Sequence, residues 1–429
     1  MNQASGKQAS LWGNVGFRSY LGSTAFTGIA FSMQQLLISW MLVGILLLPA
    51  DRVGLTQAII GIPGIFLMLW GGASADRSDP RSLLIRIYGI AWIIPLLLAL
   101  GVMSDLFNVW TVMLFGLAMS TITSFSNPAS QSILNRVAGT QVQRAVTAST
   151  GIAFLMQIIG LSLAGQMEQV GLTLVLTIQS ASLLAGAFAI RRIEPQPSAF
   201  PEKGVPTWKV VAQGLKATYA HRVIFHTLLI NFVSSIFNAG AFTTVLPFII
   251  KRVYEGDALG LAIIMIIFFG GASISNFLML KLMPFARPGR VFLAMQLSRV
   301  LIVAVLWFSP PFWLLTLVLF AWGLNMGVTS TLARTIVQES AEPQYRGRIL
   351  SVFSLGMLGS APIGAIVLGH IIEAFGTLNA LIPSMIVSTL LFTYGALATG
   401  IWRYLSPEFA SEKGGDGGDG EEPSPAGNA

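Results

Sequence analysis

Residues Ala129–Gly165 read ASQSILNRVAGTQVQRAVTASTGIAFLMQIIGLSLAG, and residues Ala333–Gly369 read ARTIVQESAEPQYRGRILSVFSLGMLGSAPIGAIVLG. The two stretches align without a gap at an offset of 204 residues (333 − 129). Identical residues at this offset include the pairs Ala129/Ala333, Arg144/Arg348, Gly160/Gly364 and Gly165/Gly369. A second region keeps the same offset, which places Leu55, Ala58, Ile59 and Ile60 on Leu259, Ala262, Ile263 and Ile264. The chain is therefore one unit of about 200 residues that occurs twice.

The composition places both copies in a membrane. Of the 429 residues, 54% are hydrophobic and 10% are charged, and the mean hydropathy is +0.73. A soluble domain carries about 25% charged residues, so lipid must cover much of this chain. The absence of Cys excludes disulfides, Cys-based zinc sites and thiol catalysis. A duplicated bundle whose repeat axis runs along the membrane normal is typical of transporters.

Twelve stretches with few or no charges are each long enough to cross about 30 Å of hydrocarbon as a helix. They are residues 17–47, 54–74, 83–104, 108–129, 145–167, 171–190, 223–249, 258–281, 291–308, 312–333, 349–373 and 377–402. We therefore expect an all-α membrane protein with 12 transmembrane helices in two pseudo-symmetric six-helix bundles. The polar N-terminus shows no signal-peptide cleavage site, so we expect the first helix to be retained.

The Lys and Arg residues orient this bundle. Arg52, Lys251 and Arg252 lie on one side, Arg299 falls inside a span, and all the others lie on the opposite side. By the positive-inside rule, we expect both termini to be cytoplasmic in a multi-pass protein of a bacterial-type inner (plasma) membrane. The same bias explains the sequence pI of about 9.9 without a nucleic-acid partner.

The predicted domains are residues 1–190 (N-terminal bundle), 191–222 (cytoplasmic linker), 223–404 (C-terminal bundle) and 405–429 (disordered cytoplasmic tail). Within the linker, Trp208, Val211, Leu215 and Tyr219 share one face of an amphipathic helix. This helix either lies on the inner leaflet or packs beneath the bundle.

The loop after the second span is Gly72-Ala-Ser-Ala-Asp76-Arg77-Ser-Asp79-Pro80-Arg81. It resembles the signature of the major facilitator superfamily, G-x-x-x-D-[RK]-x-G-[RK]-[RK]. Gly72, Asp76, Arg77 and Arg81 match this signature, whereas Asp79 stands where Gly is usual and Pro80 where a basic residue is usual. Because Asp79 replaces the usual Gly, the signature does not predict the backbone conformation of this loop.

Other segments resemble the efflux branch of that superfamily, which includes the enterobactin exporter and macrolide efflux proteins. They are Asn127-Pro128-Ala129-Ser-Gln131, Gly214-Leu215-Lys216 with His221-Arg222, and Arg346-Gly347-Arg348 with Ser351. The resemblance implies that the loop Asp closes the cytoplasmic side against the start of the eleventh helix when the outer side is open. A carboxylate near a helix N-terminus is favoured by about 0.3–1 kcal/mol. The predicted cytoplasmic gate residues are Gly72, Asp76, Arg77, Arg81, Arg136 and Arg348.

The acidic residues avoid the middle of every predicted span. Proton-coupled antiporters often bury a carboxylate, because burial raises its pKa into the working range. In the branch that this chain resembles, an acidic residue commonly follows a Gly in the first span, but here Ile29 follows Gly28. The candidate coupling residues are instead Glu168, His370 and Glu373, for which solvation at the outer surface or a structural role is the competing interpretation. Arg299, inside the ninth span, is expected to find a polar partner or to snorkel, with contact to an anionic substrate as the alternative.

Uncharged polar side chains are the candidates for the substrate cavity. They are Gln34, Gln35, Gln157, Asn238 and Asn325. The resemblance implies that spans one, four, seven and ten line the central path. Amides in lipid must find hydrogen-bond partners, so each could equally serve to join helices.

These features predict a secondary exporter of amphipathic small molecules that works by alternating access. The alternatives are a transporter of lysophospholipid or other lipid, and a transporter-like sensor or scaffold that moves nothing. An enzyme is not expected, because the sequence shows neither a metal-ligand set nor a Gly-x-x-x-x-Gly-Lys-[Ser/Thr] phosphate loop. The expected partners are the substrate and membrane lipids, with a proton gradient as a candidate. No cofactor is expected, and the chain is expected to be a monomer.

Overall fold

The computed structural model describes residues 11–77, 79–139, 141–195, 207–342, 344–407 and 409, and these are helical almost throughout. The first half contains α1 (Val15–Trp40), α2 (Ala50–Arg77), α3 (Pro80–Ala91), α4 (Ile93–Met103), α5 (Val109–Ala138), α6 (Val142–Gly165), α7 (Met167–Val170) and α8 (Leu172–Ile190). A short 3-10 helix, η1 (Leu11–Gly13), precedes α1, and a π-helical turn, η2 (Met41–Ile45), extends it. Helices α3 and α4 together make the third span.

The second half repeats this arrangement after the helix α9 (Thr207–Ala220). It contains α10 (Arg222–Gly240), η3 (Ala241–Val245), α11 (Leu246–Phe248), η4 (Ile249–Val253), α12 (Ala258–Leu282), α13 (Pro288–Trp307), α14 (Phe312–Ser340), α15 (Arg346–Phe375), η5 (Asn379–Leu381), α16 (Ile382–Leu397) and η6 (Ile401–Arg403). The elements α10 to η4 form one continuous seventh span. The fold predicted from the sequence is confirmed.

Several helices run past the predicted ends of their spans. Helix α5 reaches Ala138 and α2 reaches Arg77, because charged residues end the apolar stretch without interrupting backbone hydrogen bonding. Capping residues set other ends. The Asp79 carboxylate accepts hydrogen bonds from the backbone N–H groups of Arg81 (3.0 Å) and Ser82 (3.3 Å), so the residue that replaces the usual Gly serves as the N-cap of α3.

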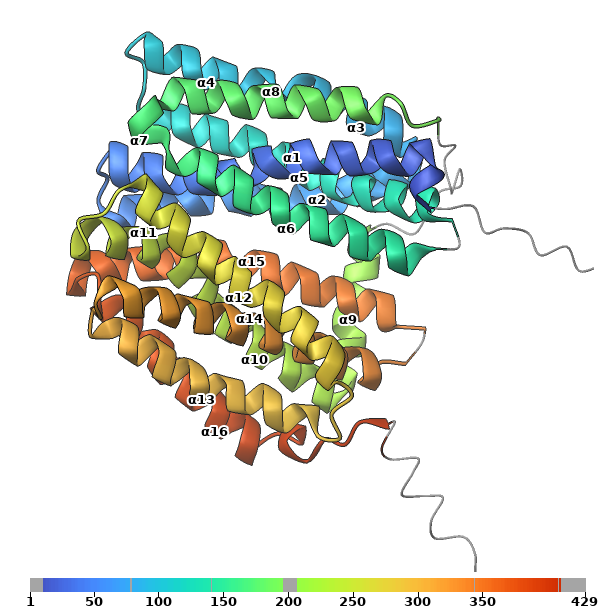
Figure 1. Ribbon diagram of the computed structural model, residues 1–429. Coiled ribbons are helices and arrows are strands. Elements are labelled where there is room, and N and C mark those ends of the chain that lie inside the picture. Colours follow the sequence, from blue (N-terminus) through green and yellow to red (C-terminus); the bar gives the residue numbers. More distant parts are fainter. Residues whose placement is uncertain are drawn as a thin grey trace, which may run out of the picture.

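The two halves form two groups of helices that lie side by side (Figure 1). Within the first half, α1 packs on α6 and α8, and α2 packs on α5. Within the second half, α10 packs on α15 and α12 packs on α14. Two extensive contacts join the halves, one between α2 and α15 and one between α6 and α12.

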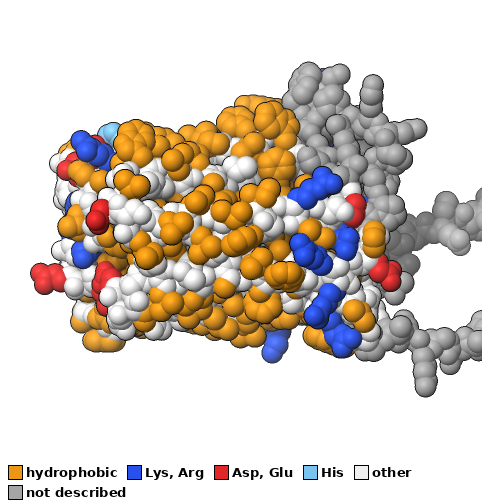
Figure 2. Space-filling view, turned by 90° about the horizontal axis from the view of Figure 1, so that it is seen from above, with side chains coloured by type: hydrophobic (Ala, Val, Ile, Leu, Met, Phe, Trp, Pro, Cys, Tyr) orange, Lys and Arg blue, Asp and Glu red, His pale blue; other side chains and the backbone are white. Residues whose placement is uncertain are grey.

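We call the end of the molecule that carries α9 and both ends of the described chain the linker face, and the other end the opposite face (Figure 1). Hydrophobic side chains dominate a broad band between these faces, and Lys and Arg gather toward the linker face (Figure 2). Eleven of the described helical segments are long and apolar enough to cross a membrane. Helix α2, with 28 residues, runs beside them and completes the twelve expected spans.

The identical glycines of the repeat occupy equivalent places in the two halves. A Cβ on Gly160 would lie 2.5 Å from the carbonyl oxygen of Ile29 on α1, and a Cβ on Gly364 would overlap the carbonyl oxygen of Ile236 on α10. These two glycines therefore allow close helix packing inside each half. A second identical pair lies where the halves meet and is described with the site below.

The linker helix α9 packs against the second half. A Cβ on Gly214 would lie 2.5 Å from the carbonyl oxygen of Arg348, so α9 touches the first turn of α15 at backbone distance. Leu215 and Tyr219 remain 44% and 70% exposed. Helix α9 therefore contacts α10 and α15, while its position on the inner leaflet, the other predicted arrangement, stays a prediction. The side chains of Trp208 and Val211 lie outside the described part.

Candidate functional site

A cavity of about 410 Å³ lies between the two halves. Its lining residues are Phe31, Gln34, Gln35, Ile38 and Ser39 of α1, Gln57, Ile60, Gly61, Gly64, Ile65 and Met68 of α2, Ser120, Thr123, Ser124 and Asn127 of α5, Thr243 of η3, and Leu358, Ala361, Pro362 and Ala365 of α15. Along α2 the cavity extends from Gln57 to Met68, which is roughly 16 Å at 1.5 Å per residue. Both halves of the molecule contribute to its walls.

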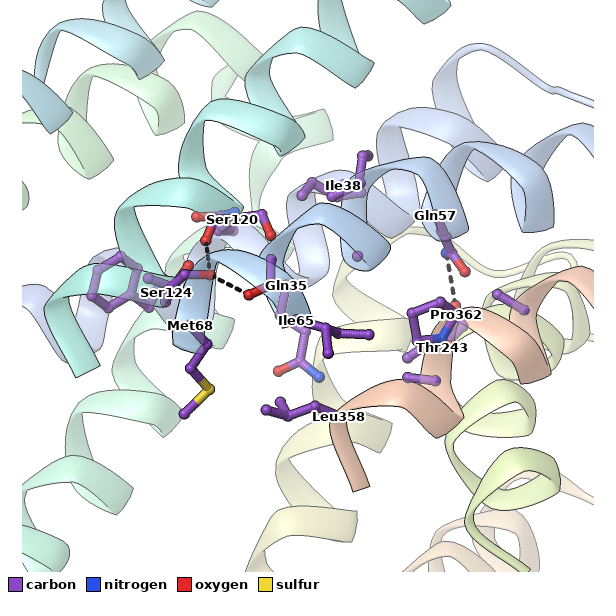
Figure 3. Close-up of a pocket in the computed structure, with 18 of the residues that line it drawn as sticks. Gln35, Ile38, Gln57, Ile65, Met68, Ser120, Ser124, Thr243, Leu358 and Pro362 are labelled. Carbon is purple, nitrogen blue, oxygen red and sulfur yellow. Dashed lines mark hydrogen bonds between the residues drawn. The ribbon is translucent and has the colours of Figure 1, made fainter. Parts of the chain in front are cut away.

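The described lining of this cavity is polar in places but carries no charged side chain. Ser124 donates a hydrogen bond to the carbonyl oxygen of Ser120 (2.8 Å) and approaches that of Gly64 on α2 (2.9 Å). Figure 3 shows Ser120 and Ser124 on one wall and Leu358 and Pro362 across from them. The predicted cavity residues Gln34 and Gln35 both line the space, and the Gln34 Oε1 atom is buried without a hydrogen-bond partner in the described chain.

Gln57 is a lining residue that the sequence did not single out. Its Nε2 atom donates to the carbonyl oxygen of Thr243 (3.0 Å) (Figure 3), and its Oε1 atom accepts from the Thr244 hydroxyl (2.7 Å). The amide therefore joins α2 of the first half to η3 of the second. The sequence could have indicated Gln57 as a cavity candidate, because it is a polar residue within an apolar span. Its partners could not be inferred, since they lie in the other half.

Glycines bring the halves into backbone contact toward the opposite face. A Cβ on Gly369 of α15 would lie 2.6 Å from the carbonyl oxygen of Ala50 on α2. Its repeat partner, Gly165 of α6, faces α12, where a Cβ would lie 2.6 Å from the Cβ of Ala262. A Cβ on Gly54 of α2 would overlap the carbonyl oxygen of Ala365 on α15. We call these two contact zones, α2 with α15 and α6 with α12, the opposite-face seal.

Two predicted coupling residues belong to the edge of this seal. The Glu373 carboxylate, at the end of α15, accepts a hydrogen bond from the backbone N–H of Ala50, the first residue of α2 (3.2 Å). The Glu168 carboxylate accepts from the Trp40 indole N–H (2.5 Å), and the Lys251 ammonium of the second half lies 5.4 Å from the centre of a Trp40 ring. Both carboxylates are exposed and neither lines the cavity. Glu373 thus places a negative charge at the N-terminus of a helix in the other half.

Replacing Glu373 with Gln is expected to weaken the seal modestly. The substitution removes a carboxylate from the α2 N-terminus, an interaction of about 0.3–1 kcal/mol at an exposed site. The population with the opposite face closed should fall about two- to fivefold relative to the open one. Spin labels on Cys residues introduced on the two halves would measure this population. The matched control is Glu255→Gln, an exposed carboxylate on the same face, and an equal shift in that variant would contradict the proposed contact.

The third predicted coupling residue, His370, is exposed on α15, and its Nδ1 atom lies 2.9 Å from the carbonyl oxygen of Ile366 in the preceding turn. It does not line the cavity. Ile29, at the position where the related branch carries an acidic residue, packs against the apolar core. Among the described residues, no titratable side chain of the predicted coupling set reaches the cavity.

The remaining predicted cavity residues lie elsewhere. Gln157 is half-buried on α6 and Asn238 is half-buried on α10. Asn238 accepts a hydrogen bond from the Trp322 indole N–H (3.0 Å) and donates to the carbonyl oxygen of Ser234 (3.0 Å). Asn238 therefore joins α10 to α14, which is the alternative role expected of these amides. None of Gln157, Asn238 and Asn325 lines the central cavity.

Asn325 belongs to a polar cluster around Arg299 inside the second half. Arg299 is 3% exposed. Its guanidinium donates to the Ser234 hydroxyl of α10, to Gln296 Oε1 (2.9 Å) and to Asn325 Oδ1 of α14 (3.0 Å). Asn325 Nδ2 in turn donates to the Ser298 hydroxyl (2.7 Å). Arg299 thus finds polar partners on neighbouring helices, one of the outcomes expected from its position, and all of these partners are neutral.

The predicted gate residues lie at the linker face. Gly72, Asp76 and Arg77 form the last turns of α2, and their side chains lie outside the described part. Arg81 donates to the carbonyl oxygen of Arg191 (2.8 Å), so here it ties α3 to the end of α8 within the first half. The other two, Arg136 and Arg348, are half-buried near the ends of α5 and α15, on different halves. Their assignment to a gate stays a prediction.

Comparison with known proteins identifies the fold family. The model of the Major Facilitator Superfamily matches residues 20–365. The chain belongs to the major facilitator superfamily. At the level of the family, this membership supports function as a secondary membrane transporter. No curated protein matches the chain in sequence.

Solved structures with this fold include proteins named as nucleoside, lysosomal-type and peptide transporters. The nucleoside transporter NupG superposes with a TM-score of 0.70 at 15% identity, covering 91% of this chain and 100% of that one. A bacterial homolog of the human lysosomal transporter Spinster, solved inward-facing and unoccupied, gives 0.69 at 14% identity, covering 94% and 100%. The peptide transporter POT in complex with sulfate gives 0.69 at 13% identity, covering 93% and 97%. At such identities the likeness extends to the fold alone.

Proposed function

We propose that this transporter is a secondary active exporter of amphipathic, weakly charged small molecules. The observation that carries the proposal is the cavity of about 410 Å³ between the halves, whose described lining combines amides and hydroxyls with apolar side chains and no charge. Amides such as Gln34 and Gln35 can orient a polar group, while Ile65, Met68 and Leu358 offer apolar surface. A small inorganic ion would find no opposite charge on these walls. The residues that resemble the efflux branch support export as the direction.

The proposed mechanism is alternating access around this cavity. In the structure the halves touch toward the opposite face through the α2–α15 and α6–α12 contacts. We assign the linker face to the cytoplasm of a bacterial-type inner membrane, because the Lys and Arg bias favours that orientation. The state described is then inward-facing, and release to the outside requires the seal to break and a cytoplasmic gate to form. Substrate shifts this equilibrium only through its different affinity for the two states.

Flux into proteoliposomes tests the proposal. The purified chain is reconstituted and offered a panel that contains an amphipathic dye, a nucleoside, a dipeptide, a lysophospholipid and an inorganic ion, with and without a pH gradient. We expect flux of the amphipathic dye. Movement of the inorganic ion alone would refute the substrate class, and movement of the lysophospholipid alone would establish the lipid-transport alternative. An absence of flux for every compound would favour a sensor.

Asp76→Asn is expected to reduce transport while leaving expression intact. In the proposed cycle, Asp76 meets the N-terminus of α15 when the cytoplasmic side closes, with Arg77, Arg136 and Arg348 beside it. Loss of the negative charge removes about 0.3–1 kcal/mol or more from the closed state, depending on burial. Flux of the amphipathic dye measures the effect, and Asp105→Asn, an exposed acid on the opposite face, is the matched control. Unchanged flux in Asp76→Asn would exclude this gate.

A further inference from the structure

We propose that a second pocket, separate from the central cavity, binds an anionic membrane lipid. This pocket has a volume of about 410 Å³ and lies where α9, α10 and α15 meet, at the linker-face end of the second half (Figure 1). Its wall is mainly apolar, with Leu215 of α9, Phe225, Leu228 and Phe232 of α10, and Val352 and Phe353 of α15. We assign one acyl chain of the lipid to this space. The site does not depend on what the central cavity transports.

Two polar groups in this wall lack ordinary partners. Thr218 of α9 is 4% exposed, and its hydroxyl has no hydrogen-bond partner in the described chain. The Asn231 side chain, 5% exposed, donates to the sulfur of Met357 (3.1 Å), which is a weak acceptor. A buried polar group without a good partner is costly in a folded protein. The ester and hydroxyl oxygens of a lipid backbone would supply the missing partners.

Two arginines lie about one helical turn beyond residues of the pocket wall, toward the linker face. Arg222 lies three residues before Phe225 on α10, and Arg348 lies four residues before Val352 on α15. At these spacings each Arg shares a helix face with a pocket residue and lies one turn closer to the linker face. The N-termini of α10 and α15 also lie at this end of the molecule, and their partial positive charge favours an anion. The exposed carboxylate of Glu342, before α15, is bound to the Gln344 amide (2.9 Å).

The position of the pocket favours a lipid over a soluble anion. It lies at the linker-face end of α10 and α15, beside the lipid-facing part of the molecule, where lipid headgroups would meet the protein. At its edge, Leu215 and Tyr219 expose 44% and 70% of their side chains. Anionic lipids attract basic protein surfaces to the membrane, and each Lys or Arg near the surface strengthens binding about fivefold. An apolar interior with two arginines beyond it matches the two parts of such a lipid.

Thiol labelling of the full chain in detergent tests the site, because the natural sequence has no Cys. Leu229→Cys places one thiol in the pocket wall, and Leu280→Cys places one on the exposed surface of α12. Dioleoyl-phosphatidylglycerol should slow labelling of Cys at position 229 at lower concentration than dioleoyl-phosphatidylcholine does. Labelling at position 280 should show no such difference. Equal effects of the two lipids at position 229, or an equal preference at position 280, would overturn the proposal.

Two further variants separate the two arginines from the interior. Arg222→Gln with Arg348→Gln should raise the phosphatidylglycerol concentration needed for protection about fivefold per removed cation. The control is Arg191→Gln with Arg192→Gln, at the linker face of the first half, which should leave this phosphatidylglycerol concentration unchanged. Gly356→Leu should abolish thermal stabilisation by phosphatidylglycerol, since a Cβ there lies 3.5 Å from Phe232 in the pocket wall. The control is Gly270→Leu, where a Cβ meets nothing within 4 Å, and phosphatidylglycerol should still stabilise this variant. If phosphatidylglycerol also still stabilises Gly356→Leu, no acyl chain binds in this pocket.

Discussion

Gly165→Ala combined with Gly369→Ala is expected to drive the transporter out of the state in which the opposite face is closed. A Cβ at either position would lie 2.6 Å from an atom of the other half, which is closer than real Cβ atoms approach. The added methyl groups strain only the closed arrangement, because these contacts join two halves that separate in alternating access. Overpacking costs about 1–3 kcal/mol per site. Each substitution should therefore shift the two-state population about 5- to 150-fold toward the open opposite face.

Spin labels on Leu106→Cys and Phe308→Cys would measure this shift, because both residues are exposed in opposite-face loops of different halves. The distance distribution should move to longer values in the double Ala variant. Gly151→Ala and Gly101→Ala are the controls, since a Cβ at either position meets nothing within 4 Å. An unchanged distribution in the seal variant, with normal folding, would show that the seal does not control access.

The fold could be predicted from the sequence, because the helices and their duplication depend on local properties of the chain. Long apolar stretches dictate helices in lipid, and a gapless offset dictates that the two halves share one arrangement. The glycine pairs of the repeat also carried positional information. Gly160 and Gly364 allow packing inside each half, whereas Gly165 and Gly369 allow packing between halves. The sequence marked all four as equivalent, but only the structure separates these two roles.

The candidate site was predicted less completely, because contacts between the halves join residues far apart in the chain. Gln34 and Gln35 could be selected as amides on the first span, and both line the cavity. Asn238 has the same chemistry, yet the Trp322 indole binds it inside the second half. Glu373 was predicted as an outer acidic residue, but its contact with the N-terminus of α2 depends on the antiparallel packing of α2 and α15. Polarity thus found the candidates, and tertiary packing decided their roles.

Asn325→Leu is expected to destabilise the folded transporter by about 1.5–3 kcal/mol, because it removes one neutral hydrogen-bond acceptor from the buried Arg299 charge. The guanidinium would lose the Asn325 Oδ1 acceptor at 3.0 Å and keep only Ser234 and Gln296. A thermal unfolding midpoint or a denaturant titration in detergent would measure the loss. Asn276→Leu, which replaces an exposed amide on α12, should change stability by about 0.5 kcal/mol or less.

The double variant Arg299→Met with Asn325→Leu should be more stable than the sum of the two single effects predicts. Once Met replaces Arg, no buried charge needs the Asn325 oxygen, so the penalty of losing that oxygen largely disappears. Residues in contact within one polar network typically show a coupling energy of about 0.5–3 kcal/mol, and this pair should lie toward the upper end. Additive losses would mean that the two side chains do not stabilise each other. Loss of dye flux in Arg299→Met at unchanged thermal stability would instead assign Arg299 to an anionic substrate, the alternative that its place inside a span left open.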